Sequence, residues 1–304
     1  GNCTLSNRKK VLIVIVNYNG YSLLNDTILS VSGLDYTNYD IVVVDNNSNE
    51  PFPNELLKRY PQVVLLKQTD NWGFAKGNNI GITYSIKEHY EYTLLLNNDV
   101  HVDSKLLSEM IDIADDNTIV VPKIYYYDKP DVLWYAGGEI LYGRMESKNI
   151  GYGEKDTGQY NKIKSIEFMN GCCTLIKNTI FEKIGLLDED YFLYFEDFDF
   201  GIRAINNGIS IQYQPKARLW HKVSSSSGGE NSKVQVYYMT RNRLIFSKKH
   251  PKVFGFRAKL FCLVKCMIKI LLAFFGYKRN NLYIINGYLD FKNNVVGKVE
   301  LEHN

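Results

Sequence analysis

The sequence predicts an α/β fold: a Rossmann-like, mostly parallel central sheet flanked by helices, with a helical extension at the C-terminal end. Two observations support this prediction. Over the first 120 residues, short β-branched runs alternate with helix-length segments, a pattern typical of parallel strands covered on both faces. From residue 231 onward, basic and apolar residues recur at helical spacing. With 304 residues, the chain is able to bury a core without disulfide or metal staples.

The carboxyl ends of the expected strands carry polar residues. The strands span residues 11–16, 41–45, 63–66 and 92–96. Three of them are followed by a polar cluster: NYNG at 17–20, DNNSNE at 45–50 and NNDV at 97–100. Ligands of open α/β sheets bind in the crevice beyond the carboxyl ends of the strands. We therefore expect these clusters to line one binding site.

The second half of the chain has a different composition. Tyrosine and glycine dominate from about 120 to 175, which favours hairpins and loops that cover one side of the crevice. A short helix is expected at 178–184, a second helix is expected to end at Gly208, and a strand follows it at 209–215. The serine-rich segment 220–230 is predicted to be a flexible loop, and the basic block after it is predicted to be helical.

The charge of the chain is unevenly distributed. Residues 1–230 contain 22 Lys and Arg against 30 Asp and Glu, whereas residues 231–289 contain 12 Lys and Arg and no acid. Such a basic block indicates an anionic partner: a phosphate group, a lipid headgroup or a nucleic acid. Nucleic acid is disfavoured, because the charges are interleaved with Leu, Ile and Phe and no recognition motif accompanies them.

Cysteine content and hydropathy predict a cytoplasmic location. The five cysteines include one adjacent pair and no CxxC motif, so neither a disulfide framework nor a zinc knuckle is indicated. The apolar run VLIVIV at 11–16 is too short for the core of a signal peptide. No stretch reaches the roughly 20 apolar residues that a membrane span requires.

Two acids and one glycine-containing segment are candidates for ligand binding. Asp99 follows the fourth strand, where a carboxylate is able to coordinate a divalent cation that bridges phosphate oxygens, although Asn-Asn-Asp also suits a simple turn. Asp45 closes the second strand and is able to accept a hydrogen bond from a base or ribose, or to form only an Asx turn. The segment 71–80, with Gly73 and Gly77, fits either an anion site or a packed helix cap.

The segment YFLYFEDFDFGIR at 191–203 surrounds acids with aromatic rings. Desolvation of Glu196 and Asp197 should raise one of their two pKa values, which suits a general base. The alternative is an acidic first helical turn stabilised by the helix dipole, with Arg203 as the ion-pair partner of Asp199. The composition of the segment favours neither interpretation.

Three further residues follow the last expected strand of the crevice. A neutral imidazole at His221 is a competent ligand for a metal that Asp99 already holds, and a structural role is the alternative. Arg241 and Arg243 are candidates for closing a donor diphosphate site, and a place on a helix surface is the alternative for both.

Taken in order, these motifs resemble glycosyltransferase family 2, in the inverting GT-A class that includes bacterial rhamnosyltransferases. The resemblance runs from about Lys10 to Phe246. Its motifs are VNYNG at 16–20, VVVDNNS at 42–48, NWGFAKGNN at 71–79, LLLNNDV at 94–100, YFEDFDFGIRA at 194–204, and His221.

The resemblance implies a GT-A catalytic domain at 1–230 and a basic helical extension at 231–304. Within the catalytic domain, about 10–120 would be the nucleotide-binding half and 121–230 the acceptor half. The expected donor-binding residues are Asn17, Asn19, Asp45, Asn46, Asn71, Gly73, Asn78 and Asn98, with Arg241 as the further candidate.

The resemblance also implies catalytic and metal-binding roles. Asp197 would deprotonate the acceptor hydroxyl, and Glu196 beside it would position substrate. Asp99 and His221 would hold the divalent cation, Mn²⁺ or Mg²⁺. The chain departs from the family's DxD metal motif, because it reads Asn97-Asn98-Asp99 and keeps only the last acid. The cation would therefore depend on diphosphate oxygens, water and His221.

The expected function is inverting transfer of a sugar from a nucleotide-diphosphate donor to an acceptor hydroxyl in bacterial polysaccharide or glycolipid synthesis. The donor would be dTDP-rhamnose or a UDP-sugar, and the acceptor a glycan or a lipid-linked sugar. The alternatives are a catalytically silent nucleotide-sugar binder and a sugar nucleotidylyltransferase. The nucleotidylyltransferase is less favoured, because no glycine-rich loop with Lys and Arg follows the first expected strand.

Residues 256–275 are predicted to form an amphipathic basic helix. Lys259, Lys265 and Lys269 share one face, opposite to a stripe of apolar residues. Such a helix suits an anionic membrane interface, and docking of its apolar stripe on the catalytic domain is the alternative. The first interpretation predicts peripheral attachment to the inner face of the cell membrane.

Overall fold

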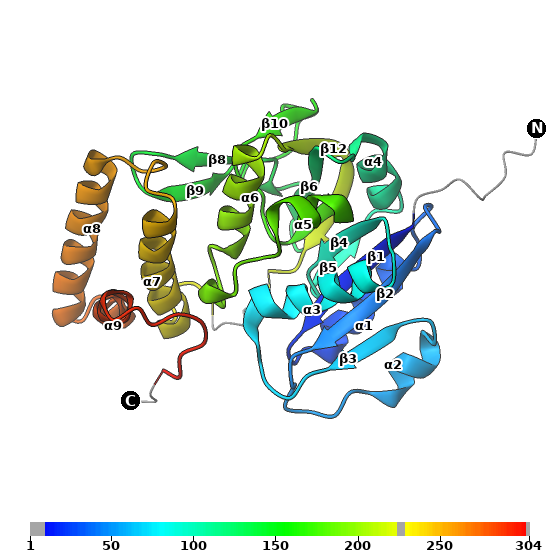
Figure 1. Ribbon diagram of the computed structural model, residues 1–304, viewed down its shortest axis with the longest axis horizontal. Helices are drawn as coiled ribbons and strands as arrows, with labels where there is room; N and C mark the ends of the chain where they lie inside the picture. Colours follow the sequence, from blue (N-terminus) through cyan, green and yellow to red (C-terminus); the bar gives the residue numbers. More distant parts are fainter. Residues whose placement is uncertain (1–9, 224–228, 302–304) are drawn as a thin grey trace, which may run out of the picture.

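A computed structural model describes residues 10–223 and 229–301 of the chain. Figure 1 shows a body that contains the central sheet, with the C-terminal helices gathered at the end of the molecule opposite to strand β3 (Val64–Lys67). Most of the paired residues of the sheet lie in parallel ladders. The predicted α/β fold with a helical C-terminal extension is confirmed.

The N-terminal part of the sheet is parallel, as the sequence predicts. Its strands are β1 (Val11–Asn17), β2 (Tyr39–Asp45), β3 and β4 (Tyr92–Leu96), in the spatial order β4, β1, β2, β3. The helices between them are α1 (Tyr21–Val31), α2 (Asn54–Arg59) and α3 (Gly73–Lys87). Asn17 is paired with Asp45, so β1 and β2 end side by side and their polar residues lie at one edge of the sheet.

The later strands extend the sheet on the β4 side. They are β5 (Val100–Val102), β6 (Thr118–Tyr126), β7 (Leu133–Tyr135), β10 (Lys164–Ile166), β11 (Cys173–Lys177) and β12 (Ser210–His221), while β8 (Gly138–Leu141) and β9 (Glu146–Asn149) form a separate hairpin. β11 runs antiparallel to β4, and β6 and β12 form a second parallel ladder. The intervening helices are α4 (Leu106–Ile113), α5 (Asn178–Ile184), the 3₁₀ turn η2 (Glu189–Tyr191) and α6 (Glu196–Asn206).

Strand β12 is longer than the sequence predicts. The expected strand at 209–215 ends on Pro215, which has no N–H group to donate to a ladder. The ladder with β6 shifts its register between Gln214 and Arg218, so the proline lies in a bulge and pairing resumes beyond it. The strand therefore continues to His221, a residue that the sequence prediction puts after the strand.

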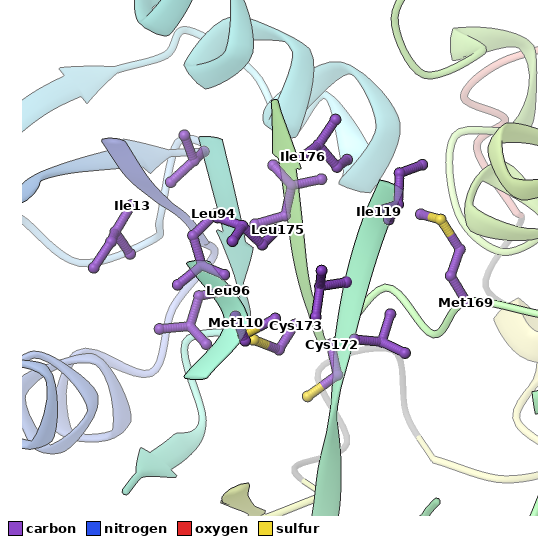
Figure 2. Close-up of a cluster of buried hydrophobic side chains, with 14 of the residues drawn as sticks. Ile13, Leu94, Leu96, Met110, Ile119, Met169, Cys172, Cys173, Leu175 and Ile176 are labelled. Atoms are coloured by element: carbon purple, nitrogen blue, oxygen red, sulfur yellow. The ribbon is translucent and has the colours of Figure 1, made fainter. Parts of the chain in front are cut away.

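The core of the sheet is apolar on both sides of β4. Figure 2 shows Leu94 and Leu96 of β4 close to Cys173 and Leu175 of β11, and all four side chains are buried. Burial raises the pKa of the Cys173 thiol well above its ordinary value, so this side chain packs as a small uncharged group. This rigid core holds the carboxyl ends of the parallel strands in register.

The C-terminal helices are α7 (Lys233–Lys249), α8 (Phe256–Phe274) and α9 (Tyr283–Lys292), with the 3₁₀ turn η3 (Arg279–Leu282) before α9. Phe246 of α7 packs edge-on against Phe198 of α6, with ring centroids 4.4 Å apart, which anchors α7 to the catalytic body. In the part of the chain that the structure describes, no helix combines the length and apolarity needed to cross a bilayer. Of the predicted serine-rich loop, residues 224–228 lie outside the described residues.

Candidate active site

A cavity of about 640 Å³ lies beyond the carboxyl ends of β1, β2 and β4. Six of the residues expected to bind donor or metal line it: Asn46, Asn71, Gly73, Asn98, Asp99 and His221. They come from the ends of β2 and β4, the start of α3 and the end of β12. The sheet topology therefore brings these residues to one cavity of the size typical of small-molecule sites, about 300–1,000 Å³.

A buried hydrogen-bond network supports the floor of this cavity. Asn17 donates to Asp45 (Nδ2 to Oδ1, 3.0 Å) and accepts from Asn98 (Nδ2 to Oδ1, 2.9 Å), so three strand ends are linked by side chains. Ser48 donates its hydroxyl to Asp45 at 2.8 Å and accepts a hydrogen bond from the backbone N–H of Asn19. Asn17 and Asp45 are almost fully buried, so in this structure they position the loops beside the cavity.

Asp99 and His221 face each other at the cavity wall. Asp99 Oδ1 lies 3.2 Å from His221 Nε2, close enough for the two atoms to ligate one cation. The pairing of His221 with Val100 in the β12–β5 ladder produces this contact. A carboxylate oxygen and an imidazole nitrogen are a donor set that suits Mn²⁺ and related divalent cations. Among the described residues, no third His, Cys, Asp or Glu completes a metal-binding group.

The start of α3 is held by the aromatic segment before α6. Gly73 has a positive φ of 76°, and a Cβ added to it would lie 2.4 Å from the ring of Phe192. The carbonyl of Phe192 accepts a hydrogen bond from the Phe74 N–H at 2.9 Å, so it occupies part of the helix N-terminus. Asn46 donates to the Gly73 carbonyl at 2.9 Å, whereas the buried Asn78 donates to the Phe74 carbonyl and does not line the cavity.

The two candidate catalytic acids begin helix α6. Asp197 accepts hydrogen bonds from the backbone N–H groups of Phe198 at 2.8 Å and Gly171 at 3.0 Å. Burial raises the pKa of Asp197 to about 6, and the two N–H donors limit the rise. Burial, and then the charge of Asp197, raise the pKa of Glu196 well above its ordinary value, and Glu196 Oε2 is buried without a hydrogen-bond partner. Near neutral pH, Asp197 is therefore the ionised member of the pair.

Asp197 lies beside the cavity, behind one aromatic ring. A Cβ added to Gly171 would lie 3.3 Å from the ring of Phe74 and 3.5 Å from Asp197 Oδ2, so these groups are neighbours. Phe74 lines the cavity, whereas Asp197 does not. Residues before α6 have unusual backbone geometry, because Phe192 and Phe195 both have a positive φ, which bulky side chains rarely adopt. Such strain is typical of functional segments.

A second layer of charged side chains fixes α6 in place. The ion pair expected between Asp199 and Arg203 is present, with Oδ2 and Nε 2.8 Å apart. Asp199 Oδ1 also lies 2.7 Å from Nε2 of His250, at the end of α7. Burial alone would raise the pKa of Asp199, but the hydrogen bond to His250 and the charge of Arg203 lower it below its ordinary value. These contacts orient the helix that carries Asp197.

A match to a protein-family model identifies the family to which this chain belongs. Residues 12–185 match the model of Glycosyl transferase family 2. The chain belongs to this family. Members of the family are transferases, so this family 2 enzyme is a glycosyltransferase, and the alternative of a sugar nucleotidylyltransferase is not supported.

Curated relatives of this family 2 enzyme include sugar transferases of glycan synthesis. The low-salt glycan biosynthesis hexosyltransferase Agl10 of Haloferax volcanii is 28% identical over 79% of this chain and 78% of its own. The dTDP-rhamnosyl transferase RfbF of Shigella flexneri is 27% identical over 84% of this chain and 86% of its own. The N-acetylglucosaminyl-diphospho-decaprenol L-rhamnosyltransferase of Mycobacterium tuberculosis is 23% identical over 71% and 77%. The resemblance to rhamnosyltransferases is confirmed at the level of the family.

The fold of this family 2 enzyme is shared with solved glycosyltransferases. The crystal structure of GalNAc-T7 with UDP, GalNAc and Mn²⁺ superposes with a TM-score of 0.62, at 19% identity, over 84% of this chain and 53% of that one. At this identity the likeness concerns the fold alone. It confirms the predicted GT-A fold.

Arg241 does not line the cavity at the strand ends of this family 2 enzyme. Its side chain is fully buried, and its guanidinium packs over the rings of Tyr237 and Tyr238. Nη2 donates to the carbonyls of Asp190 and Tyr191, at 3.3 and 3.4 Å. The expectation of a donor-binding arginine is therefore corrected, because in this structure Arg241 ties α7 to η2.

The C-terminal extension adds residues to this cavity that the sequence did not predict. Lys233, Tyr238 and Lys298 line it together with the strand ends. Lys298 Nζ lies 2.7 Å from Asp70 Oδ1, and the neighbouring Val299 N–H donates to the Tyr238 hydroxyl at 3.0 Å. No motif marks Lys298, whose contact with Asp70 joins residues far apart in the sequence. Only the basic character of the extension pointed to an anionic ligand.

Proposed function

We propose that this enzyme transfers a sugar from a nucleotide-diphosphate donor to an acceptor hydroxyl with inversion at the anomeric carbon. The supporting observation is the arrangement of two kinds of groups around one cavity. Asp99 and His221 lie within 3.2 Å of each other at its wall, and Asp197, whose pKa is raised to about 6, lies beside it. The relative RfbF is named for a dTDP-rhamnosyl donor, so dTDP-rhamnose is the first donor to test, and UDP-sugars are the second.

The donor would lie across the ends of β1, β2 and β4. Asn46, Asn71 and Asn98 offer amide groups to the nucleoside within the cavity, and the Asn17–Asp45 network fixes the loops that carry them. Lys298 and Lys233 line the same cavity and would neutralise diphosphate charge in place of Arg241.

Asp99 and His221 would hold a divalent cation, Mn²⁺ or Mg²⁺. The cation, when bound, neutralises charge that develops on the leaving diphosphate. Two protein ligands leave coordination positions for diphosphate oxygens and water, which agrees with the single carboxylate of Asn97-Asn98-Asp99. The solved fold neighbour GalNAc-T7 contains Mn²⁺, which favours Mn²⁺ as the first cation to test.

Asp197 would act as the general base of a single displacement. Its carboxylate takes the proton of the acceptor hydroxyl while that oxygen bonds to the anomeric carbon. The bond from this carbon to the diphosphate oxygen breaks on the opposite face, and its electron pair leaves with the diphosphate. The attack and departure on opposite faces invert the anomeric configuration.

Replacement of Asp197 tests this assignment. Asp197→Asn keeps the shape of the side chain but lacks basicity, and its single amide oxygen is able to accept only one of the two hydrogen bonds that Gly171 and Phe198 donate to separate oxygens of Asp197. We expect transfer to fall by at least about 100-fold, the lower end of general-base effects, while nucleoside diphosphate still binds with unchanged affinity in calorimetry. Unchanged transfer would exclude Asp197 as the base, and a wild-type chain that binds donor without transfer would be the silent binder.

The extension would also hold the enzyme at an anionic membrane surface, on the inner face of the cell membrane. Many large apolar side chains of α8 are exposed: Phe256 is 79% exposed, Leu271 is 58% exposed and Phe275, just after the helix, is 83% exposed. Exposed apolar residues interleaved with Lys are typical of helices that lie in a charged interface. This placement suits a lipid-linked acceptor.

A further inference from the structure

A second cavity, of about 540 Å³, lies between the three C-terminal helices. Figure 1 shows α7, α8 and α9 grouped at one end of the molecule, with α8 at the outer edge. Most of the lining is apolar, and includes Leu244 of α7, Leu263, Met267 and Ile270 of α8, and Ile284 and Phe291 of α9. Met145, from the β8–β9 turn, closes it on the side of the catalytic body. The cavity is thus a separate apolar compartment of ligand size.

Cations gather where this compartment adjoins a smaller cavity of about 300 Å³. Arg243 lines both cavities, and Lys269 and Lys278 line the smaller one; Lys248 and Lys259 also line the compartment. Burial, and then the charges of Lys265 and Arg243, lower the pKa of Lys269, so these cations crowd one another.

Two acids face the same cluster of cations. Glu146 pairs with Lys265, and Glu230 lines the smaller cavity. Arg243, Lys265, Lys269 and Lys278 exceed these two acids in number, so this end of the compartment remains suited to an anion.

Arg243 connects the compartment to the segment that carries the base. Its guanidinium carbon lies 5.7 Å from the ring centroid of Phe195, two residues before Asp197. Its Nε donates to the Met145 carbonyl at 3.1 Å, which holds the side chain between the two regions. A ligand that binds Arg243 therefore lies close to the segment that carries Asp197.

The exposed side chains of α8 indicate whether a ligand reaches the compartment from a bilayer or from water. Only Ala258 and Ala273 of this helix are buried, and Leu260, Val264 and Leu272 are between 42% and 48% exposed. The helix is therefore apolar both toward the compartment and toward its surroundings. A hydrocarbon chain that leaves a bilayer along α8 would meet apolar side chains on its whole path.

We propose that this compartment binds the hydrocarbon chain of a lipid diphosphate, with the diphosphate beside Arg243 and Lys269. The proposal rests on the proposed function, because it identifies this lipid as the carrier of the acceptor sugar. The charges at one end and the apolar walls match the two parts of such an amphiphile. The decaprenyl diphosphate in the name of the mycobacterial relative has the same chemistry.

Thiol labelling of the full chain reports on occupancy of the compartment. Cys262 and Cys266 line it and are partly exposed. The hydrogen bond with Cys266, and then the charges of Arg243 and Lys265, lower the pKa of Cys262 to about 6, which makes it reactive. The probe is farnesyl diphosphate, below its micelle concentration, with N-ethylmaleimide labelling followed by peptide mass spectrometry. We expect labelling of Cys262 to slow about tenfold when the probe is at about ten times its Kd.

Two further ligands distinguish the contribution of the hydrocarbon chain from that of the diphosphate headgroup. Farnesol, which lacks the charges, should protect Cys262 more weakly than farnesyl diphosphate. Inorganic diphosphate, which lacks the chain, should give no protection at the same concentration. Equal protection by inorganic diphosphate would overturn the proposal in favour of a free-anion site, and unchanged labelling with farnesyl diphosphate would overturn it altogether.

Matched substitutions on α8 locate the binding site. Ile270→Trp fills the compartment and should abolish protection of Cys262, whereas Ile268→Trp adds the same ring on the exposed face and should leave protection intact. Melting temperatures confirm that both variants fold. Equal loss in the two variants would instead indicate adsorption on the outer face. Nucleoside diphosphate binding to wild type is measured in parallel, because it tests the donor site independently of this compartment.

Discussion

At the scale of single residues, the proposed mechanism makes transfer depend on the protonation of Asp197. The backbone N–H groups of Phe198 and Gly171 hold its carboxylate, yet burial keeps its pKa at about 6. A base with this pKa is mostly ionised at neutral pH and still accepts a proton readily. Burial and the charge of Asp197 raise the pKa of Glu196 beside it well above its ordinary value.

The pH dependence of transfer follows from this pair. Below its pKa the base is protonated and inactive, so kcat/KM should rise about tenfold per pH unit up to roughly pH 6 and then level off. Glu196→Gln mimics the protonated acid and should leave the midpoint in place. Initial rates from pH 4.5 to 8 at saturating cation measure this profile, and a rate that is flat through pH 6 would contradict the role of Asp197.

His221 should matter for cation binding and little for stability of the sheet. His221→Ala removes Nε2, which lies 3.2 Å from Asp99 Oδ1. We expect the affinity for Mn²⁺ in the presence of nucleoside diphosphate to fall by at least about tenfold, or roughly 1.4 kcal/mol. Calorimetric titration measures it, and His101→Ala, on the neighbouring exposed position of β5, is the control. Unaltered Mn²⁺ affinity would remove His221 from the cation site.

Lys298 should contribute to donor binding through its charge. Lys298→Ala is expected to raise the donor KM about tenfold with little change in kcat, as loss of a charge-assisted hydrogen bond would. Asp70→Asn breaks the ion pair but keeps the lysine, so donor KM should not rise. Lys292→Ala, at the exposed end of α9, is a second control. If Asp70→Asn and Lys298→Ala raise KM equally, Lys298 acts only by positioning the loop.

At the scale of elements, the contact between α3 and the aromatic segment before α6 joins the proposed donor and acceptor sides. Gly73 carries this contact, because its φ is 76° and the ring and carbonyl of Phe192 lie where a Cβ would be. Any side chain at this position must displace the segment that leads to Asp197.

Alanine substitutions separate crowding from backbone strain at this contact. Gly73→Ala adds both left-handed strain and overlap, and should lower the free energy of unfolding by roughly 2–5 kcal/mol. Gly153→Ala has a similar φ of 78° and open space around it, so only roughly 1–2 kcal/mol is expected. Urea denaturation measures both. Equal losses of unfolding free energy in the two variants would mean that Phe192 moves aside without an energetic cost.

The elements that the sequence predicted are those with a local signal. The strands of the parallel half follow from β-branched runs, and their polar ends predicted the cavity. The end of β12 was missed because the bulge at Pro215 depends on pairing with β6. The burial of Arg241 was not predicted, because it depends on the packing of α7 against η2. No residue near Arg241 in the sequence indicates this packing.

At the scale of the whole molecule, the C-terminal extension contributes to the catalytic body and also faces outward. Lys298 and its neighbours complete the wall of the cavity at the strand ends, a contact between distant parts of the chain that no local pattern encodes. The outward side of α8 was predictable, since its apolar and basic residues alternate at helical spacing. The proposal of a membrane surface as its partner depends on the exposure of these side chains, which only the structure gives.

Attachment to membranes should depend on both the apolar face and the charge. Leu271→Glu with Phe275→Glu places acids on the exposed face of α8 and should abolish co-sedimentation with vesicles of phosphatidylcholine and phosphatidylglycerol. Leu29→Glu, equally exposed on α1, should not. Binding of the wild type should weaken as salt rises, because the Debye length falls from about 10 Å at 0.1 M to about 3 Å at 1 M. Absence of wild-type binding at low salt would refute this attachment.

The central claim is that the donor diphosphate and its cation meet Asp99 and His221 while the sugar faces Asp197. A crystal structure with Mn²⁺ and the nucleoside diphosphate that gives the largest thermal shift tests it most directly. The account predicts an anomalous Mn²⁺ peak within coordination distance of Asp99 Oδ1 and His221 Nε2, with the diphosphate in the cavity next to Lys298. A peak at other residues, or a nucleotide outside this cavity, would contradict it.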